Sequence, residues 1–310
     1  MQPLVVIAGP TASGKTALAI ALAKRINGEV ISADSMQIYR GMNIGTAKPT
    51  TDEMQGIPHH LLDVAEPEEN FSLEKFATLA HATIQEIVSR GKIPILAGGT
   101  GLYIDTVAEN RALSADSFDP KIRKKLEERW EKEGAEKLYV ELSQIDPTAA
   151  DKLHIAEKRR IIRALEIFYT TGKTKTWHAE KKSEKIYNYF IFAIELPRNI
   201  LYNRINRRVE DMLAAGLMEE VRDLHTRLYG KETTAKQGVG YKELFWYLDG
   251  RATFEEAVSL LKRNTRRLAK RQMTWFRANP SIYWLDGQQG LEEITRQCME
   301  KLAEGNEVWR

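Results

Sequence analysis

The sequence predicts an α/β fold, a parallel β-sheet flanked by helices, accompanied by an all-helical insertion domain. In residues 1–115, short apolar runs alternate with helical patterns and glycine-rich turns, which is typical of βαβ units and a parallel sheet. Residues 116–190 are mostly helical in pattern and dense in Lys and Arg. Residues 191–310 are expected to complete the core and to carry a basic helical region.

The individual elements are predicted from apolar spacing and capping residues. Strands are expected at 4–8, 28–33, 93–97 and 189–196, and helical segments at 14–26, 72–90 and 200–277. Ser72 suits the N-cap of its helix. Asp119 followed by Pro120 marks the first helix of the insertion, because proline is tolerated at the first helical position.

Composition narrows the class of protein. With 310 residues, 43% hydrophobic and 29% charged, the chain is expected to be soluble and globular, and its net charge of +3 excludes nothing by itself. The single cysteine, Cys298, rules out a disulfide framework and a cysteine-based zinc site. Residues 1–8 lack the basic start of a signal peptide, and no apolar run reaches membrane-spanning length. A cytoplasmic, reducing compartment is therefore expected. We also expect a monomer, although none of these observations bears on the oligomeric state.

The first strand is followed by a phosphate-binding loop. Its pattern is G-x-x-x-x-G-K-[ST] between a strand and a helix. Glycines allow backbone N–H groups to surround an anion, and the helix N-terminus adds positive potential. Lys15 would reach the terminal phosphates and the Thr16 hydroxyl would ligate Mg²⁺. The residues of this diphosphate- or nucleotide-binding loop are Gly9, Pro10, Thr11, Ala12, Ser13, Gly14, Lys15 and Thr16.

Two further polar clusters follow the second and third expected strands. Asp34, after the run 28–33, could bind Mg²⁺ through water, act as a general base, or simply cap a turn. Thr100 lies in the glycine-rich stretch 98–103, which could also be only a tight turn. Because function in parallel sheets gathers at the carboxyl ends of the strands, these clusters are expected near the phosphate loop.

Basic residues concentrate near the C-terminus. Residues 262–277 contain seven Lys and Arg and no acid, together with aromatic side chains, a pattern that favours nucleic-acid binding. Arg204 and Arg208 share a helix face and could clamp phosphate oxygens or pair with carboxylates. The adjacent His59 and His60 would point apart and are interpreted as structural.

Taken in order, these motifs resemble those of the bacterial tRNA dimethylallyltransferases. The matching stretches are GPTASGKT (9–16), DSMQIYRGMNIGTAKP (34–49), PHHLLD (58–63), GGTGLY (98–103), RALEIF (163–168), LYNRINRRVEDML…GLMEEV (201–221), GVGYKE (238–243) and TRRLAKRQMTWFR (265–277). The resemblance implies a P-loop kinase-like core and a prenyltransferase. Such an enzyme would transfer the dimethylallyl group of dimethylallyl diphosphate to the exocyclic N6 amine of the adenosine 3′-adjacent to the anticodon, releasing diphosphate. It implies Mg²⁺ as cofactor and the tRNA anticodon stem-loop as partner.

The resemblance also implies roles for particular residues. Asp34 would be the general base, Thr100 would lie beside the reacting amine, and Arg208, helped by Arg204, would stabilise the leaving group. The phosphate loop would hold the diphosphate, with Thr16 on Mg²⁺. The implied tRNA contacts are Asp34, Ser35, Met36, Gln37, Thr100, Arg123, Arg159, Arg160, Arg163, Gln237, Gly240, Tyr241 and Lys242.

Three other functions share some of these features. An adenylate isopentenyltransferase would use the same loop but need neither the insertion nor the basic region. A P-loop kinase would transfer phosphate from ATP and leave the run 262–277 unexplained. A non-catalytic RNA-binding protein would have no use for Asp34 beside an intact Lys15 and Thr16.

Overall fold

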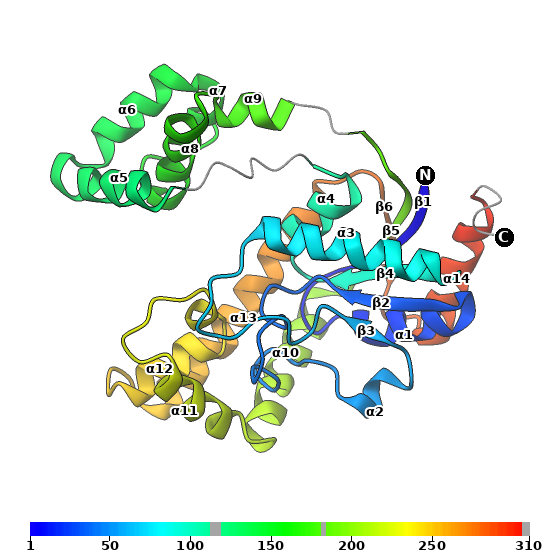
Figure 1. Ribbon diagram of the computed structural model, residues 1–310. Helices are drawn as coiled ribbons and strands as arrows, with labels where there is room; N and C mark the ends of the chain where they lie inside the picture. Colours follow the sequence, from blue (N-terminus) through cyan, green and yellow to red (C-terminus); the bar gives the residue numbers. More distant parts are fainter. Residues whose placement is uncertain (112–118, 181–183, 306–310) are drawn as a thin grey trace. The chain divides into compact units, whose positions relative to one another are not determined.

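The computed structural model describes residues 1–111, 119–180 and 184–305 (Figure 1). Its contacts divide the chain into two compact units. We call Met1–Glu109 with Lys185–Arg310 the core unit, and Asn110–Glu184 the helical unit. These divisions lie at 109 and 184, slightly before the sequence-based divisions at 115 and 190.

The core unit is built on a parallel β-sheet. In the described residues its strand order is β3-β2-β4-β1-β5-β6, and each neighbouring pair is parallel. The strands are β1 (Gln2–Ala8), β2 (Gly28–Ser32), β3 (His59–His60), β4 (Ile93–Gly98), β5 (Tyr187–Glu195) and β6 (Ile282–Asp286). The predicted α/β class with a parallel sheet is confirmed. The strand order places β1, which leads into the phosphate loop, between β4 and β5.

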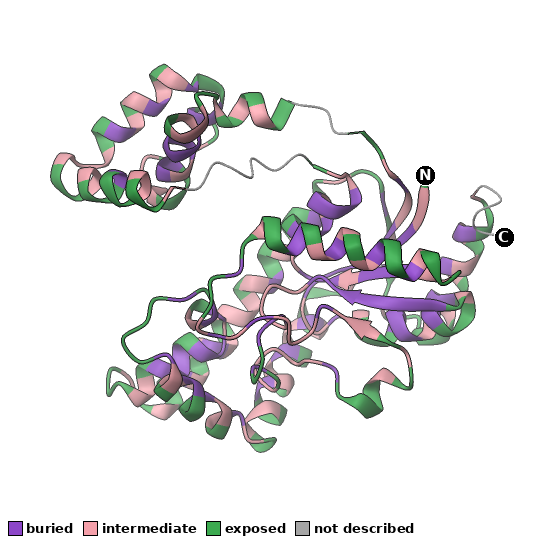
Figure 2. Ribbon diagram, in the orientation of Figure 1, coloured by how far each residue is buried: buried purple, intermediate pink, exposed green. Residues whose placement is uncertain are grey.

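Helices cover both faces of the sheet, and alternate side chains of β1 serve the two faces. Val5 and Ile7 pack in the cluster that contains residues of α1 (Lys15–Ile26) and α14 (Leu291–Ala303). Leu4 and Val6 pack in the cluster that contains residues of α3 (Leu73–Ser89) and α4 (Gly101–Ala108). Figure 2 shows the result on α3, where buried and exposed stripes alternate around the helix. As predicted, Ser72 caps α3 by accepting a hydrogen bond from the Lys75 N–H.

The second half of the core unit is largely helical, as predicted, from α10 to the end of α13. The helices are α10 (Arg198–Ala214), α11 (Leu217–Arg227), the short η2 (Ala235–Gln237), α12 (Tyr241–Leu248) and α13 (Phe254–Arg277). Residues of α10 to α13 join the same hydrophobic cluster as α3 and α4. The sequence did not predict the one-turn α2 (Thr51–Met54), β3, α4, β6 or α14.

The helical unit has its own small core. Its helices are α5 (Pro120–Glu133), α6 (Ala135–Ile145), α7 (Pro147–Ala150), α8 (Lys158–Thr171) and α9 (Lys175–Glu180), and Asp119 caps α5 as predicted. Leu126, Leu138, Leu142 and Leu165 are among the residues at its centre. The side chain of Asn110 donates a hydrogen bond to the Glu184 carbonyl oxygen at 2.9 Å, so the first and last residues of the unit touch.

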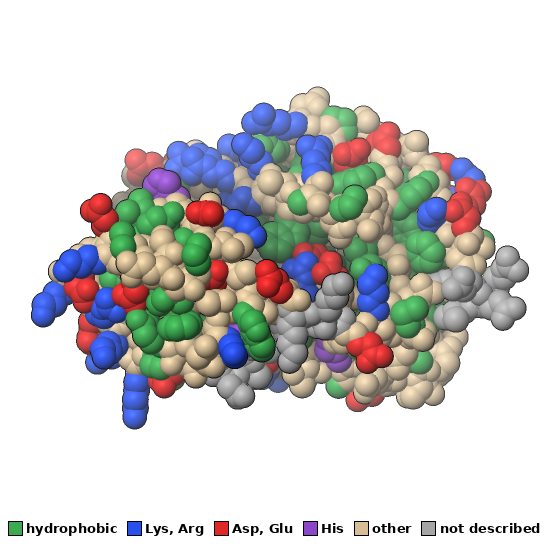
Figure 3. Space-filling model, turned by 90° about the horizontal axis from the view of Figure 1, so that it is seen from above, with side chains coloured by type: hydrophobic (Ala, Val, Ile, Leu, Met, Phe, Trp, Pro, Cys, Tyr) green, Lys and Arg blue, Asp and Glu red, His purple; other side chains and the backbone are tan. Residues whose placement is uncertain are grey.

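Charged side chains of the helical unit are extensively paired. Arg129 binds Glu133 and Glu141 at 2.8 and 2.7 Å, and Lys158 binds Glu131 at 2.6 Å. On the face of the molecule in Figure 3, Lys and Arg side chains likewise stand among Asp and Glu side chains. Paired charges largely cancel at a distance. The positive potential of this unit is therefore weaker than its number of Lys and Arg residues suggests.

Candidate active site

The phosphate loop joins β1 to α1 in the strand–loop–helix arrangement that its motif requires. Gly14, the N-cap of α1, has a φ of 101°, a left-handed conformation that favours glycine. The Lys15 ammonium folds back over the loop and donates a hydrogen bond to the Pro10 carbonyl oxygen at 2.7 Å. Because α1 begins at Lys15, its first backbone N–H groups have no acceptor within the helix and are available to an anion beside Lys15 and Thr16.

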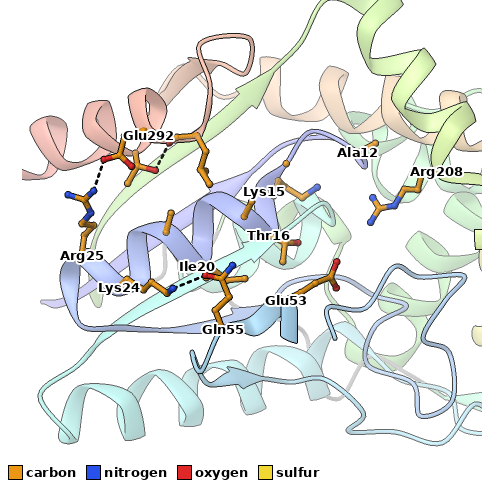
Figure 4. A pocket seen from close by; sticks show the side chains of 15 residues that line it. Ala12, Lys15, Thr16, Ile20, Lys24, Arg25, Glu53, Gln55, Arg208 and Glu292 are labelled. Atoms are coloured by element: carbon orange, nitrogen blue, oxygen red, sulfur yellow. Dashed lines mark hydrogen bonds and ion pairs between the residues drawn. The ribbon is translucent and has the colours of Figure 1, made fainter. Parts of the chain in front are cut away.

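Two cationic side chains converge on this space. Burial lowers the pKa of the Lys15 ammonium to about 8, an effect that nearby Asp34 opposes and nearby Arg208 reinforces. Burial also lowers the pKa of the Arg208 guanidinium, and Asp34 opposes this shift too. Figure 4 shows Lys15 and Arg208 reaching from opposite sides into the cavity beside the loop. Partly desolvated positive charges of this kind are attracted to a multiply charged anion.

Away from the loop, the same cavity continues as a groove along α1. Its sides carry two exposed pairs, Lys24 with Gln55 at 2.7 Å and Arg25 with Glu292 at 2.6 Å (Figure 4). Lys24 and Arg25 are thus engaged with partners along the groove. The cations of this cavity that face the anion site of the loop are Lys15 and Arg208.

The three polar clusters of the sequence meet in one cavity at the carboxyl edge of the sheet. The lining combines the loop after β1, the turn after β2, the end of β4, and side chains of α10 and α13. Its residues are Thr11, Lys15, Thr16, Asp34, Gln37, Thr46, Ala47, Ala97, Gly98, Arg208 and Gln272.

Of the three roles that the sequence left open for Asp34, the structure shows the turn cap. Its Oδ1 accepts a hydrogen bond from the Met36 N–H at 2.9 Å, so it does cap the turn after β2. The residue also lines the cavity together with Lys15 and Arg208. The Thr100 hydroxyl joins this turn, since it accepts from the Ser35 N–H at 3.1 Å. The bond between Ser35 and Thr100 therefore ties the turn that carries Asp34 to the end of β4.

The Gln37 amide is fully engaged with protein groups. The Ser32 hydroxyl donates to its Oε1 at 3.0 Å, and its Nε2 donates to the carbonyl oxygens of Thr46 and Ala47, both at 3.2 Å. Gln37 thus ties the turn after β2 to the loop of residues 43–47. A contact between Gln37 and a base stays a prediction, and it would require one of these bonds to be exchanged.

Gln272 of α13 is a cavity residue that the sequence analysis missed. Its Oε1 accepts from the Thr11 N–H at 2.9 Å, and its Nε2 donates to the Gly99 carbonyl oxygen at 3.0 Å. One amide therefore links the phosphate loop to the glycine-rich turn after β4. The sequence feature that could have indicated this role is the uncharged amide of Gln272 within the basic run 262–277.

An apolar compartment adjoins the polar cavity, and Asp34, Arg208 and Gln272 lie at the boundary between the two. Its walls come from α10, α11, α13 and the segment before α12. The apolar lining residues include Met36, Ile205, Val209, Met212, Leu217, Val239, Leu261 and Leu268. Such a compartment suits a short hydrocarbon group attached to an anion.

The predicted tRNA-binding residues of the helical unit are differently placed. Arg123 and Arg163 both bind the buried Glu166, at 3.1 and 2.9 Å. Arg160 pairs with Glu157 at 2.8 Å at the surface, and Arg159 is exposed. Arg159 and Arg160 are therefore accessible to a ligand, whereas Arg123 and Arg163 are oriented by an internal carboxylate. Their contacts with tRNA stay predictions.

The stretch 237–242 is also divided between surface and interior. Gln237 ends η2, and Lys242 is exposed with its ammonium 5.9 Å from the centre of the Trp246 ring. Tyr241 is only 1% exposed, and its hydroxyl donates to Glu220 at 2.6 Å. Its predicted contact with tRNA is not available to the side chain in this conformation. Arg204, in contrast to Arg208, is exposed and lies outside the cavity lining.

Other expectations about ligands can be compared with the described residues. Within them, no group of three His, Cys, Asp or Glu side chains is arranged to hold a metal ion. His60 pairs with the buried Glu29 at 2.7 Å and His59 with the Ile57 carbonyl, which agrees with their structural interpretation. Among the residues that the structure describes, no helix is both long enough and apolar enough to cross a bilayer.

Comparison with known proteins identifies the family. The model of the IPP transferase family matches residues 37–279. A tRNA dimethylallyltransferase of Carboxydothermus hydrogenoformans is 47% identical over 308 residues, which are 98% of this chain and 99% of the relative. Its counterpart in Bacillus subtilis is 47% identical over 289 residues, 92% of this chain and 91% of the relative.

Solved structures agree with these relatives. The tRNA isopentenylpyrophosphate transferase of Bacillus halodurans superimposes with a TM-score of 0.73 at 45% identity, covering 98% of both chains. A eukaryotic dimethylallyltransferase acting on tRNA gives a TM-score of 0.84 at 31% identity, covering 98% of this chain and 79% of that one. Together with the family match over most of the chain, these likenesses show that the chain belongs to the IPP transferase family.

Proposed function

We propose that this chain is a tRNA dimethylallyltransferase. It transfers the dimethylallyl group of dimethylallyl diphosphate to the N6 amine of the adenosine 3′-adjacent to the anticodon and releases diphosphate. The observation that carries the proposal is the cavity, which brings a carboxylate, two cations and an apolar compartment together. The printed names of the relatives support the same activity.

The phosphate loop binds the diphosphate of the donor. Lys15 and Arg208 face the anion from two sides and stabilise the charge that grows on it as the C1–O bond breaks. The Thr16 hydroxyl lies in the same cavity and, together with the oxygens of the diphosphate, would suit a hard cation, so Mg²⁺ fits here without a cluster of carboxylates. When bound, Mg²⁺ supplies further neutralisation of the leaving diphosphate.

Asp34 removes the proton that the amine must lose. As the N6 lone pair forms a bond to C1 of the allyl group, the C1–O electron pair leaves with the diphosphate, and one N6 proton passes to the Asp34 carboxylate. Thr100 is held beside Asp34 through Ser35 and can accept a hydrogen bond from the amine. The target base is flipped out of its stack, since its amine is otherwise out of reach.

The dimethylallyl tail occupies the apolar compartment. Met36, Ile205, Val209 and Leu268 are among its walls, which exclude water from the allylic carbon. Exclusion of water favours transfer to the amine over hydrolysis of the donor.

The test is a reaction without ATP. An unmodified anticodon stem-loop with adenosine 3′ of the anticodon is incubated with Mg²⁺ and dimethylallyl diphosphate, and the RNA mass is followed. The expected result is a gain of one dimethylallyl group. An unchanged RNA mass, with ATP consumed in a parallel reaction, would replace the proposal with the kinase alternative.

A further inference from the structure

Glu220 of α11 holds the backbone of a loop that lies far away in sequence. Its Oε2 accepts from the N–H groups of Asn43 and Ile44, both at 2.8 Å, and its Oε1 accepts from the Gly45 N–H at 2.9 Å. Consecutive N–H groups that converge on one carboxylate form charge-assisted hydrogen bonds, which are stronger than neutral ones. Glu220 therefore binds one end of residues 43–47, which we call the wall loop.

A fourth donor aligns the carboxylate. The Tyr241 hydroxyl donates to Glu220 Oε1 at 2.6 Å. The Tyr241 ring lies so close to the wall loop that a Cβ at Gly45 would stand 2.5 Å from the ring. Only glycine allows this approach, so the wall loop is pressed between Glu220 and Tyr241.

The other end of the wall loop lines the cavity that contains Asp34. Thr46 and Ala47 line the polar cavity with Asp34, and their carbonyl oxygens accept the two hydrogen bonds that Gln37 Nε2 donates. Gln37 in turn is three residues beyond Asp34, in the same turn after β2. A short path of hydrogen bonds thus runs from Glu220, through the wall loop and Gln37, to the turn that carries Asp34.

We propose that Glu220 is a positioning residue of the transfer reaction. It touches neither reactant; it sets the place of the wall loop and thereby the geometry of the Asp34 turn and of the cavity beside it. The proposal rests on the proposed function, because the Asp34 turn matters to catalysis only if Asp34 takes part in the reaction. Displacement of a catalytic group by about 1 Å is enough to slow a reaction roughly 100-fold.

The neighbouring glutamate provides a matched control. Glu219 is 73% exposed and pairs with Arg222 of the same helix at 3.3 Å. Glu219→Gln and Glu220→Gln remove the same charge from adjacent positions of α11. Both replace one carboxylate oxygen with an amide nitrogen, which cannot accept a hydrogen bond, but only at position 220 do the wall-loop N–H groups lose an acceptor.

Three measurements are compared for wild type and both variants: kcat and KM for each substrate, the thermal unfolding midpoint, and amide hydrogen exchange of a peptide spanning residues 43–47. For Glu220→Gln we expect kcat to fall about 10- to 100-fold, with KM for dimethylallyl diphosphate changed less than about twofold. Exchange should accelerate in the wall loop and not across the sheet. Glu219→Gln should match wild type in all three.

Each outcome bears on the proposal. If Glu220→Gln has the same kcat as Glu219→Gln, the proposal is overturned. It is also overturned if Glu220→Gln exchanges faster throughout the protein and regains the kcat of wild type at low temperature, because the variant would then be only less stable. If wild type itself transfers no dimethylallyl group, the proposed function has failed instead. Should Glu220→Gln not fold, Tyr241→Phe removes one of the four hydrogen bonds; a several-fold loss of kcat supports the proposal and an unchanged kcat overturns it.

Discussion

Asp34 caps a turn and also faces the cavity, and one pair of substitutions separates the two roles. Asp34→Asn keeps an oxygen that can accept from the Met36 N–H, but an amide cannot take a proton at neutral pH. We expect both Asp34→Asn and Asp34→Ala to lower the single-turnover rate by about 10²- to 10⁴-fold, with tRNA affinity retained in a filter-binding assay. An active Asp34→Asn enzyme would mean that only the turn matters.

The lowered pKa of Lys15 predicts that binding of dimethylallyl diphosphate depends on pH. Burial brings its pKa down to about 8 in the protein without ligand, from an ordinary value of 10.5. The diphosphate binds the charged ammonium, so affinity is full below pH 8 and falls as the pH rises through that value, by up to tenfold per unit. Binding of dimethylallyl diphosphate between pH 7 and 9.5 measures this.

The control for Lys15 is the variant Lys15→Arg. A guanidinium stays charged over the whole range, so this variant should bind more weakly through altered geometry yet lose the fall with pH. If wild type and Lys15→Arg showed the same pH profile, the titrating group would be another one.

At the scale of elements, close contact between strand ends holds the cavity together. At the end of β4, a Cβ on Gly98 would lie 2.2 Å from the Ala33 carbonyl oxygen, which is backbone and cannot turn aside. We expect Gly98→Ala to lower the free energy of unfolding by about 3 kcal/mol in urea titrations. The exposed Gln85→Ala on α3 should change it by less than about 0.5 kcal/mol. Equal stability of the two variants would show that β2 and β4 separate freely there.

The strands and helices that the sequence predicted are those with strong local signals. β1, β2 and β4 are apolar runs followed by glycine or polar turns, and α3 and α5 have capping residues. β3 has only two residues, His59 and His60, too few to show a period. In β6 the buried residues Ile282 and Leu285 are three positions apart, so the strand lacks the two-residue alternation, and it is recognisable as a strand chiefly by its pairing with β5.

The site was predictable as far as motifs reached. The loop of residues 9–16, Asp34 and Thr100 are drawn together because parallel strands end at one edge, and α10 adds Arg208 to the same cavity. Gln272 and Glu220 were missed because their partners lie 261 and 177 residues away for the bonds to Thr11 and Asn43. No spacing rule along one helix reveals such pairings. For the same reason the burial of Tyr241 could not be read from its motif.

At the scale of the whole molecule, the charge of α13 predicts how binding to tRNA responds to salt. Part of the basic run is paired within the core unit, as Lys262 with Glu210 at 2.7 Å shows. Arg267, Lys270 and Arg271 are exposed. Replacing these three by Gln should reduce the slope of log affinity against log salt by about 2, since each phosphate that is no longer neutralised accounts for about 0.7. Affinity is measured across a series of KCl concentrations.

A control with the same loss of charge uses α1 and α14. Arg25, Arg296 and Lys301 pair with glutamates and belong to the helices on the other face of the sheet. Their replacement by Gln should leave the slope as in wild type. A similar change of slope in both triple variants would point to overall charge, and the assignment of α13 as an RNA-binding face would be wrong.

The contact between Asn110 and Glu184 has a consequence for how such a chain can change over generations. The helical unit leaves and rejoins the core at one point, so a single stretch of coding sequence encodes all of it. One insertion, deletion or exchange of that stretch would alter the unit and leave the strand order of the sheet as it is. Substitutions within the helical unit can thus be selected almost independently of those that alter the sheet and the cavity of the core unit.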